Sequence, residues 1–306
     1  MESNSLNALQ QEISALKKSR NAVILAHNYV RPEIQDIADF CGDSLELSIR
    51  AKELGAELLV FCGVSFMAET AKILSYGSRV LLPVPEAGCP MADMVDIREL
   101  KEFKASHPDA LLAAYVNTTA ATKALIDICC TSANADKIIS SLPADREVMF
   151  LPDRNLGQNV IDATQRKMSL WHGCCPIHDQ VTPEMILKAK SEHPGCPVLI
   201  HPECPPQTLA LADYAVSTGK MLKVVKDDPA PGFIVATEHG IIHRLKKENP
   251  DREFYPVSPL LVCEDMKKIT LESVRDALKY DQYEVKLDAD LAENAQKAIV
   301  RMLDVK

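Results

Sequence analysis

Three cysteines recur at a spacing that could bring them to one metal centre. Cys89, Cys175 and Cys263 are separated by 86 and 88 residues, and each lies in a turn between a strand-like segment and a helical stretch. Three thiolates are one short of the four that fully ligate a common iron–sulfur cluster or a structural zinc. A 4Fe-4S cluster on three cysteines leaves one iron open, and that iron can act as a Lewis acid that eases the loss of water. The spacing therefore indicates a cluster that takes part in chemistry.

Polar residues repeat at the same interval along the chain. An aspartate recurs after 88 and then 86 residues, at Asp39, Asp127 and Asp213. Twelve residues before each aspartate stands a polar ring, and two residues further on a second polar or aromatic group: His27 with Tyr29, Tyr115 with Asn117, and His201 with Glu203. Five residues after each aspartate stands a hydroxyl: Ser44, Ser132 and Thr218. The pattern predicts three copies of one structural unit rather than a solenoid of short repeats.

Short β-branched runs alternate with helical stretches, which is typical of parallel sheets flanked by helices. The predicted strands are Ala22–Ala26, Glu57–Phe61, Ala110–Tyr115, Glu147–Leu151, Pro197–His201 and Gly232–Thr237. The predicted helices are Leu45–Leu54, Met67–Ser75, Val95–Ser106, Ala133–Ser141, Thr182–Glu192, Gly219–Lys226, Glu238–Glu248 and Thr270–Tyr280. We expect α/β repeats at 21–107, 108–194 and 195–280, with terminal helical segments at 1–20 and 281–306.

The repeated residues should meet at the carboxyl ends of the strands, where ligands bind in open parallel sheets. Three units around a pseudo-threefold axis would point these ends at one central cavity. Ser44, Ser132 and Thr218 fall where helices should begin, and serine and threonine are favoured helix N-caps. Helix N-termini hold carboxylates and phosphates, so these positions together with His27 and His201 could bind a small polyanion. A role as helix caps alone is the alternative for the three hydroxyls.

Composition excludes several classes of partner. The net charge of −9 argues against nucleic acid and against an anionic membrane surface. Residues 1–20 are polar and resemble no secretory signal, and no apolar run reaches the roughly 18 residues that span a bilayer. We expect a cytoplasmic protein, in which the ten cysteines are ligands, catalytic groups or buried thiols rather than disulfides.

Eight motifs in order resemble the quinolinate synthase family, over roughly residues 21–277. They are His27-Asn28-Tyr29, Gly42-Asp43-Ser44, Tyr115-Val116-Asn117, Thr131-Ser132-Ala133-Asn134, Trp171-His172-Gly173-Cys174-Cys175-Pro176-Ile177-His178, His201-Pro202-Glu203-Cys204, Ala236-Thr237-Glu238-His239-Gly240-Ile241 and Cys263-Glu264-Asp265-Met266-Lys267-Lys268-Ile269-Thr270.

The resemblance implies three similar αβα domains in pseudo-threefold symmetry around a 4Fe-4S cluster on Cys89, Cys175 and Cys263. It implies condensation of iminoaspartate with dihydroxyacetone phosphate to quinolinate, with loss of phosphate and two waters, for NAD synthesis. It places Glu203 as the general base and Tyr29 in triose isomerisation, with His27 and His201 also catalytic. The substrate-binding residues would be His27, Ser44, Tyr115, Val116, Asn117, Ser132, His201, Pro202, Glu203 and Thr218. The upstream aspartate-oxidising enzyme is a conceivable protein partner.

Other functions and roles remain open at this point. A reductive dehydroxylase with a three-cysteine cluster, or an electron carrier, would use the same cysteines. Some family members carry further cysteines after the third ligand, whereas Met266 stands here, which puts a C-x-x-C disulfide switch in doubt. We expect the six cysteines without threefold partners to be buried thiols: Cys41, Cys62, Cys129, Cys130, Cys174 and Cys196. Cys204 stays undecided.

Several aromatic and histidine positions also allow more than one role. His178 and His243 could lie near the site or at the surface, and Tyr29 could be a packed aromatic residue. His107 and His193 look like helix-end residues, and the last 25 residues fit a solvated amphipathic helix.

Overall fold

The structure, a computed structural model, describes residues 2–305 and divides into two compact units. The first unit comprises Met1–Cys89 and Cys263–Ala292, and the second comprises Pro90–Val262 and Glu293–Lys306. Among the described residues, no helix combines the length and apolar character needed to cross a membrane.

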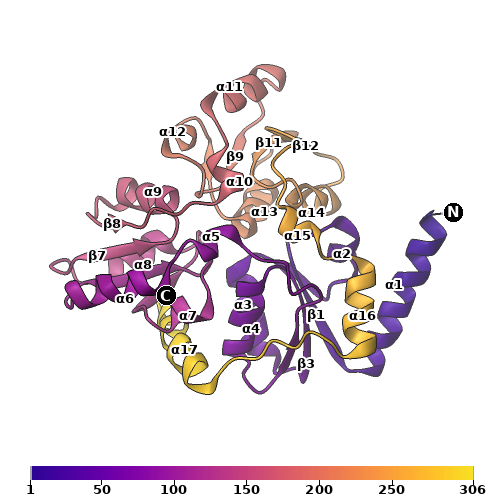
Figure 1. Cartoon of the computed structure of the whole chain (residues 1–306). Helices are drawn as coiled ribbons and strands as arrows, with labels where there is room; N and C mark the ends of the chain where they lie inside the picture. The colour runs from indigo at the N-terminus through magenta and orange to yellow at the C-terminus, as the bar shows by residue number, and fades with distance from the viewer. Residues whose placement is uncertain (1, 306) are drawn as a thin grey trace. The chain divides into compact units, whose positions relative to one another are not determined.

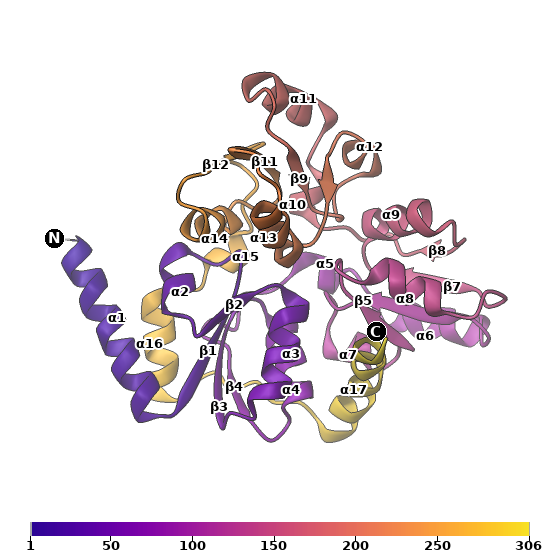
Figure 2. The same cartoon turned by 180° about the vertical axis from the view of Figure 1, so that it is seen from behind.

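The first unit is built on a parallel sheet in the order β2-β1-β3-β4. Its elements are α1 (Glu2–Ser19), β1 (Ala22–His27), α2 (Pro32–Ile37), β2 (Phe40–Gly42), α3 (Ser44–Leu54), β3 (Leu58–Cys62), α4 (Ser65–Leu74), β4 (Arg79–Leu81), α15 (Glu264–Lys267) and α16 (Leu271–Tyr280). Helices α1 and α16 pack side by side on one face of the sheet, and α3 and α4 cover the other (Figures 1 and 2). Because both faces are covered, β1 and β3 are almost wholly apolar and buried.

The second unit contains two further parallel sheets, in the orders β6-β5-β7-β8 and β10-β9-β11-β12. The elements around the first of these are α5 (Pro90–Asp93), α6 (Ile97–Ser106), β5 (Leu111–Tyr115), α7 (Ala120–Lys123), β6 (Ile128–Cys130), α8 (Ala135–Ser141), β7 (Val148–Leu151), α9 (Arg154–Thr164) and β8 (Ser169–Leu170). Those around the second are α10 (Pro176–Asp179), α11 (Pro183–Glu192), β9 (Val198–Ile200), α12 (Pro206–Leu209), β10 (Tyr214–Ala215), α13 (Thr218–Asp227), β11 (Gly232–Ala236), α14 (Ile241–Glu248) and β12 (Glu253–Pro256). Helix α17 (Ala289–Asp304) begins in the first unit and runs on into the second.

The predicted fold class is confirmed, because the described residues form three four-stranded, all-parallel sheets of one strand order, flanked by helices. The predicted strands and helices are all present, with ends shifted by up to three residues. The repeat extends to elements not predicted from the sequence. Each cysteine of the spaced set directly precedes an unpredicted four-residue helix (α5, α10 or α15), and one of the predicted helices, ten residues long, follows it (α6, α11 or α16). The domain boundaries and the pseudo-threefold arrangement about one centre stay predictions.

The repeated aspartate is a structural lock in each sheet. Its carboxylate accepts the backbone N–H of a residue early in the first strand, at 2.8 Å in all three sheets: Asp39 to Ile24, Asp127 to Leu112 and Asp213 to Val198. Its own N–H donates to the carbonyl of the same residue, at 2.9, 2.9 and 3.1 Å. The aspartate thus fixes where the second strand joins the first, which explains why it recurs at the spacing of the repeat.

The prediction that Ser44, Ser132 and Thr218 cap helices was wrong by one or two residues. The caps of α3 and α13 are Asp43 and Ser217, whose side chains accept backbone N–H groups of the first turn. Before α8 the Thr131 hydroxyl accepts the Ala133 N–H, and the N-cap position is Asn134. The physical reason is that Ser44 and Thr218 already have helical backbone geometry, so their hydroxyls cannot reach the free N–H groups ahead of them.

The lock can be tested with Asp127→Ala. The substitution leaves the Leu112 N–H at the start of β5 without its acceptor, so we expect a loss of about 1–3 kcal/mol in the free energy of unfolding, measured by urea denaturation. Asp145→Ala, on an exposed turn, is the control and should change stability by less than about 0.5 kcal/mol. Equal midpoints for the two variants would contradict a structural role for the repeated aspartate.

Candidate functional site

A buried carboxylate, Glu203, lies at the centre of the polar residues of the second unit. Glu203 stands on the loop after β9, and its side chain is almost fully buried. The Tyr115 hydroxyl, at the end of β5, donates to Oε1 at 2.5 Å, and His178 Nδ1 on α10 lies 2.6 Å from Oε2. Such short bonds are typical of an ionised acceptor. Two donors from two different elements therefore hold one negative charge.

His178 is itself fixed on both ring nitrogens. With Nδ1 donating to Glu203, Nε2 accepts from the hydroxyl of Thr237, just beyond β11, at 2.7 Å. The ring stacks on that of His201, with 4.5 Å between centroids. Thr237, His178, Glu203 and Tyr115 thus form one chain of hydrogen bonds, in which each member orients the next.

His201 presents a proton from a neutral ring. Its Nδ1 accepts the Glu203 N–H at 3.3 Å, so the proton of the neutral ring is on Nε2, 3.3 Å from the Ser132 hydroxyl. Burial lowers the pKa of His201 to about 3, with the nearby His178 also lowering it. His27 in the first unit repeats the arrangement, since its Nδ1 accepts the Tyr29 N–H at 3.2 Å. Both histidines are therefore set as Nε2–H donors.

Two buried acids in this unit have pKa values driven in opposite directions. Burial, and secondly the charge of Glu203, raise the pKa of Asp153 well above its usual range. Burial alone would also raise the pKa of Glu203, but the hydrogen bonds from His178 and Tyr115 to its carboxylate outweigh burial and lower that pKa. Their surroundings thus favour the ionised form of Glu203 and the protonated form of Asp153. Such a separation marks out a candidate base and a candidate proton holder.

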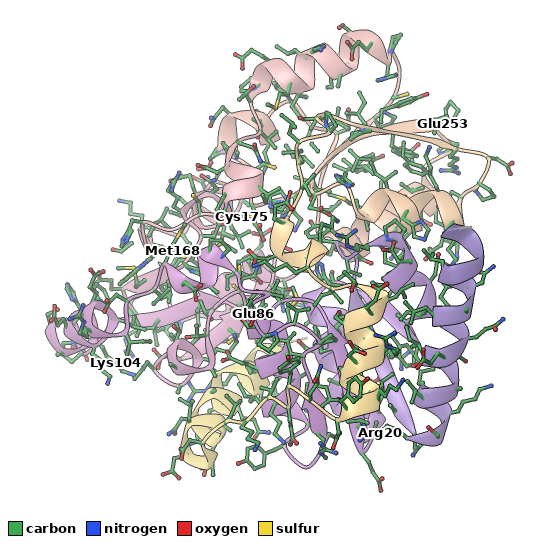
Figure 3. The ribbon with its side chains drawn as sticks, turned by 45° about the vertical axis from the view of Figure 1, so that its right-hand side comes forward. Arg20, Glu86, Lys104, Met168, Cys175 and Glu253 are labelled. Carbon is green, nitrogen blue, oxygen red and sulfur yellow. The ribbon has the colours of Figure 1, made fainter. Side chains whose placement is uncertain are left out.

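Cys175 lies directly beside this network. Cys175, labelled in Figure 3, is the N-cap of α10. Its N–H donates to Asp153 Oδ2 at 3.2 Å. The turn before it passes so close to the end of β7 that a Cβ on Gly173 would lie 2.8 Å from the Pro152 carbonyl oxygen. The glycine therefore allows the thiol-bearing turn to sit against Asp153.

The other two cysteines of the spaced set lie in the first unit, on turns that are bonded to each other. The Gly88 N–H, next to Cys89, donates to Asp265 Oδ1 at 3.3 Å, and Lys268 Nζ donates to the Glu86 carbonyl at 2.8 Å. Asp265 and Lys268 belong to the turn and helix that follow Cys263. In the same unit the Tyr29 ring meets the His27 ring edge-on at 4.7 Å.

The three cysteines have the chemistry that a cluster needs. None of them is in a disulfide, all are partly exposed, and each directly precedes a short helix whose N-terminus favours a thiolate. Four other cysteines contrast with them: Cys62, Cys129, Cys130 and Cys204 are fully buried, and burial raises the pKa of each thiol, that of Cys129 to about 12. The expectation of burial is thereby confirmed for Cys62, Cys129 and Cys130. It is wrong for Cys41, Cys174 and Cys196, which are partly exposed where their turns and strand ends meet solvent.

A single metal ion on Cys175, His178 and Glu203 is a poorer interpretation. Their ligand atoms lie within 4.8 Å of one another. However, both nitrogens of His178 and both oxygens of Glu203 already have protein partners. An ion would have to break these bonds, so the group is better described as a hydrogen-bond network next to a thiol.

The structure thus brings together Tyr115, Ser132, His201, Glu203 and Cys175 of the predicted residues. Asn117 stands on the loop after β5, and its buried Oδ1 has no hydrogen-bond partner among the described residues, as expected of a group that awaits a ligand. Val116 and Pro202 make backbone hydrogen bonds near these residues: the Val116 N–H donates to the Cys130 carbonyl, and the Pro202 carbonyl accepts from Asn159 Nδ2. Thr218 is buried at the first turn of α13, and Lys220 of that turn donates to the Ala133 carbonyl, next to Ser132.

Sequence reasoning missed several residues that shape the site. His178 was left undecided and is a central member, whereas Thr237, Asp153, Asn155 and Asp179 were not considered individually. His178 corresponds by spacing to Ala92 and Met266, so a search for repeated residues could not find it. The available signal was its position three residues after Cys175, on the same helical turn.

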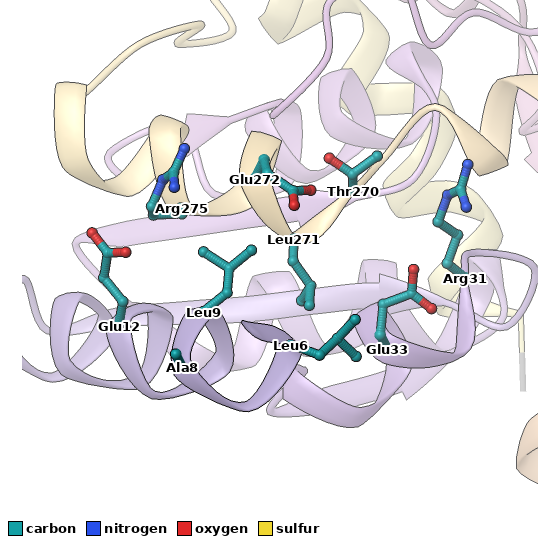
Figure 4. Close-up of a pocket in the computed structure, with 10 residues that line it drawn as sticks. All are labelled: Leu6, Ala8, Leu9, Glu12, Arg31, Glu33, Thr270, Leu271, Glu272 and Arg275. Carbon is teal, nitrogen blue, oxygen red and sulfur yellow. The ribbon is translucent and has the colours of Figure 1, made fainter. Parts of the chain in front are cut away.

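A separate groove of about 530 Å³ lies in the first unit (Figure 4). Leu6 and Leu9 of α1 and Leu271 of α16 form its floor, with Arg31 and Glu33 at one end. Its charges are mixed, and none of the predicted site residues lines it. It is therefore a packing groove between helices rather than the predicted site.

Comparison with known proteins decides the family. A family model described as "Quinolinate synthetase A protein" matches residues 11–304. The chain belongs to the quinolinate synthetase A family. The resemblance read from the eight motifs is thereby confirmed over a longer stretch than the motifs cover.

Curated relatives in this family match almost end to end and carry the name quinolinate synthase. The protein from Methanoregula boonei is 50% identical over 295 residues, covering 96% of this chain and 97% of the relative. Those from Geobacter metallireducens and Thermodesulfovibrio yellowstonii are 49% and 48% identical over 299 residues each, with 97–98% of each chain covered. The relatives indicate an enzyme with small-molecule substrates.

The lowered pKa of His201 predicts a pH dependence of stability. In the unfolded chain this histidine takes up a proton below about 6.5, whereas in the folded state it stays neutral down to about 3. Acidification between these values therefore favours unfolding, by up to about 1.4 kcal/mol per pH unit. We expect His201→Gln to flatten the loss of stability on acidification by that amount, measured by urea unfolding between pH 4 and 7. His107→Gln, at an exposed helix end, controls for the loss of a histidine. Parallel curves for wild type and His201→Gln would contradict the assignment.

Proposed function

We propose that this chain condenses iminoaspartate with dihydroxyacetone phosphate to form quinolinate, releasing phosphate and two waters, in the de novo synthesis of NAD. The near full-length match to quinolinate synthases carries this proposal. The same match decides against the reductive dehydroxylase and the electron carrier that the cysteines alone left open. Formation of new bonds between two carbon skeletons would make the enzyme a transferase, working in the cytoplasm, where its thiols stay reduced.

Cys89, Cys175 and Cys263 would hold a 4Fe-4S cluster in this proposal. When bound by three cysteines, such a cluster supplies a Lewis-acidic iron that assists the departure of substrate oxygens as water. The thiols fit the role because they are outside disulfides, partly exposed and placed at helix N-termini.

The protein's own residues would bind and orient the substrates. His27 and His201, as Nε2–H donors, suit substrate carboxylates, while Ser44, Ser132 and Thr218 suit phosphate and hydroxyl oxygens. The unpartnered Oδ1 of Asn117 suits an N–H or O–H group of the substrate. Neutral donors suffice for these anions, so no cluster of lysines or arginines is needed.

Glu203 would serve as the general base. It is ionised at neutral pH, buried away from water, and oriented by Tyr115 and His178. A base whose proton affinity is reduced by neighbours becomes stronger when a substrate displaces one of its donors. Tyr29, packed against His27, would assist isomerisation of the triose.

The whole proposal is tested by anaerobic reconstitution with iron and sulfide, followed by an assay for quinolinate with both substrates. We expect a brown protein with about four irons per chain and substrate-dependent quinolinate. A fully loaded protein that makes no quinolinate would overturn the proposal.

Cys175→Ala tests the cluster ligand. With two of three ligands left, we expect the iron content after reconstitution to fall strongly and quinolinate formation to drop at least about 100-fold. Cys196→Ala removes a partly exposed thiol outside the spaced set and should keep both. Full activity in Cys175→Ala would rule out its role.

Glu203→Gln tests the base. The amide has nearly the same shape but takes up no proton, so we expect wild-type iron content and a fall in kcat of about 10²–10⁴-fold. Glu102→Gln, on the exposed face of α6, is the matched control. Wild-type turnover in Glu203→Gln would show that another group takes the proton.

A further inference from the structure

Helix α9 is hydrogen-bonded to the loop that carries Glu203. Asn155 and Asn159 lie four residues apart, on one face of the helix. Asn159 Nδ2 donates to the carbonyls of Pro202 and Cys204, at 2.7 and 3.1 Å, and Asn155 Nδ2 donates to the Glu203 carbonyl at 3.2 Å. Two side-chain amides therefore bind three consecutive carbonyls of this loop.

Of these two asparagines, Asn155 also donates a hydrogen bond to helix α10. Its Nδ2 also donates to Asp179 Oδ1 at 2.8 Å. Asp179 ends α10, the short helix that begins after Cys175. Arg154 donates to both oxygens of Asp179 at 3.0 Å, which fixes the carboxylate that Asn155 binds. One buried amide group thus joins the Cys175 helix to the Glu203 loop.

The close packing of α9 against its sheet holds Asn155 in place. A Cβ on Gly157 would lie 2.5 Å from Leu170 Cδ2 and 2.8 Å from Phe150 Cδ1, so the helix packs on β7 and β8 at a distance that only glycine allows. At the start of the helix Asp153 caps it through the Leu156 N–H and binds the Cys175 N–H. The first turn of α9 is therefore a rigid platform for both groups.

We propose that Asn155 is a positioning residue that holds the Glu203 loop and the Cys175 helix in one fixed relation. The amide suits this role because its NH₂ group supplies two donors, one for each side. An aspartate of the same shape would supply none and would face Asp179 with a like charge. The inference rests on the proposed function for the roles of Glu203 and Cys175, whereas the coupling itself rests on the contacts above.

The chain provides a matched pair of variants. Asn155→Ala releases both segments, whereas Asn159→Ala removes bonds to the loop only. In the protein without cluster, backbone hydrogen exchange followed by mass spectrometry reads peptides over 172–180 and 200–206 separately. Since each lost bond is worth about 1 kcal/mol, we expect roughly 5-fold faster exchange in both peptides for Asn155→Ala. For Asn159→Ala we expect it only over 200–206.

The reconstituted variants give a second measurement. Because Asn155→Ala loosens the ligand helix and the base together, we expect an altered electron paramagnetic resonance signal of the reduced cluster and a kcat lower by about 100-fold at nearly unchanged KM. Asn159→Ala should keep the wild-type signal. If Asn155→Ala does not fold, Asp179→Ala replaces it and should speed exchange over 172–180.

Exchange that stays at the wild-type level over 172–180 in Asn155→Ala, or in its replacement, would overturn the proposal. Equal acceleration in Asn155→Ala and Asn159→Ala over both peptides would do the same, because it would show general loosening. A wild-type enzyme without quinolinate synthesis would instead overturn the proposed function and leave the exchange pattern intact.

Discussion

An ionised carboxylate that is removed from water must be surrounded by donors, and Glu203 imposes this requirement on its whole surroundings. The Tyr115 hydroxyl and the His178 ring donate hydrogen bonds to the carboxylate directly. Thr237 contributes indirectly, because its hydroxyl donates to the His178 ring and fixes its orientation. These groups come from the ends of two strands in different sheets and from the turn after Cys175. Loss of any one would leave a buried polar atom unpaired, at a cost of about 1–3 kcal/mol or more. The relative placement of these elements is therefore tied to a single charge.

The repeat provides the backbone for this arrangement but not its chemistry. The aspartate lock is the same in all three sheets, because each sheet needs the same join between its first two strands. At the strand ends the side chains diverge: His27, Tyr115 and His201 occupy one equivalent position, and Tyr29, Asn117 and Glu203 the next. In the second unit the ionised carboxylate of Glu203, the neutral ring of His201 and the unpartnered Oδ1 of Asn117 occur together only because these positions differ between the repeats.

This division explains what could be predicted from the sequence. Spacing identifies residues that serve the same purpose in every copy, so the sheets and helices were predicted correctly from it. It also singled out the three cysteines, whose role as cluster ligands stays a prediction. It misplaced the caps at Ser44 and Thr218, because the residue before each also carries a suitable side chain, Asp43 or Ser217, and only backbone geometry decides between neighbours. It could not find His178 or Asn155, since their contacts are made in one copy alone and join segments that lie about 25 and 48 residues away in the sequence.

Burial also sorts the titratable groups into distinct roles. In the proposed reaction, binding of anionic substrates by lysines would place ammonium groups beside Glu203 and lower the proton affinity of its carboxylate. A neutral histidine avoids this conflict. Because burial lowers the pKa of His201 to about 3, its Nε2–H donates a hydrogen bond without surrendering or taking up a proton at neutral pH. Glu203 is buried as well and stays charged because hydrogen bonds compensate its carboxylate, so a neutral donor and an ionised acceptor stand only two residues apart.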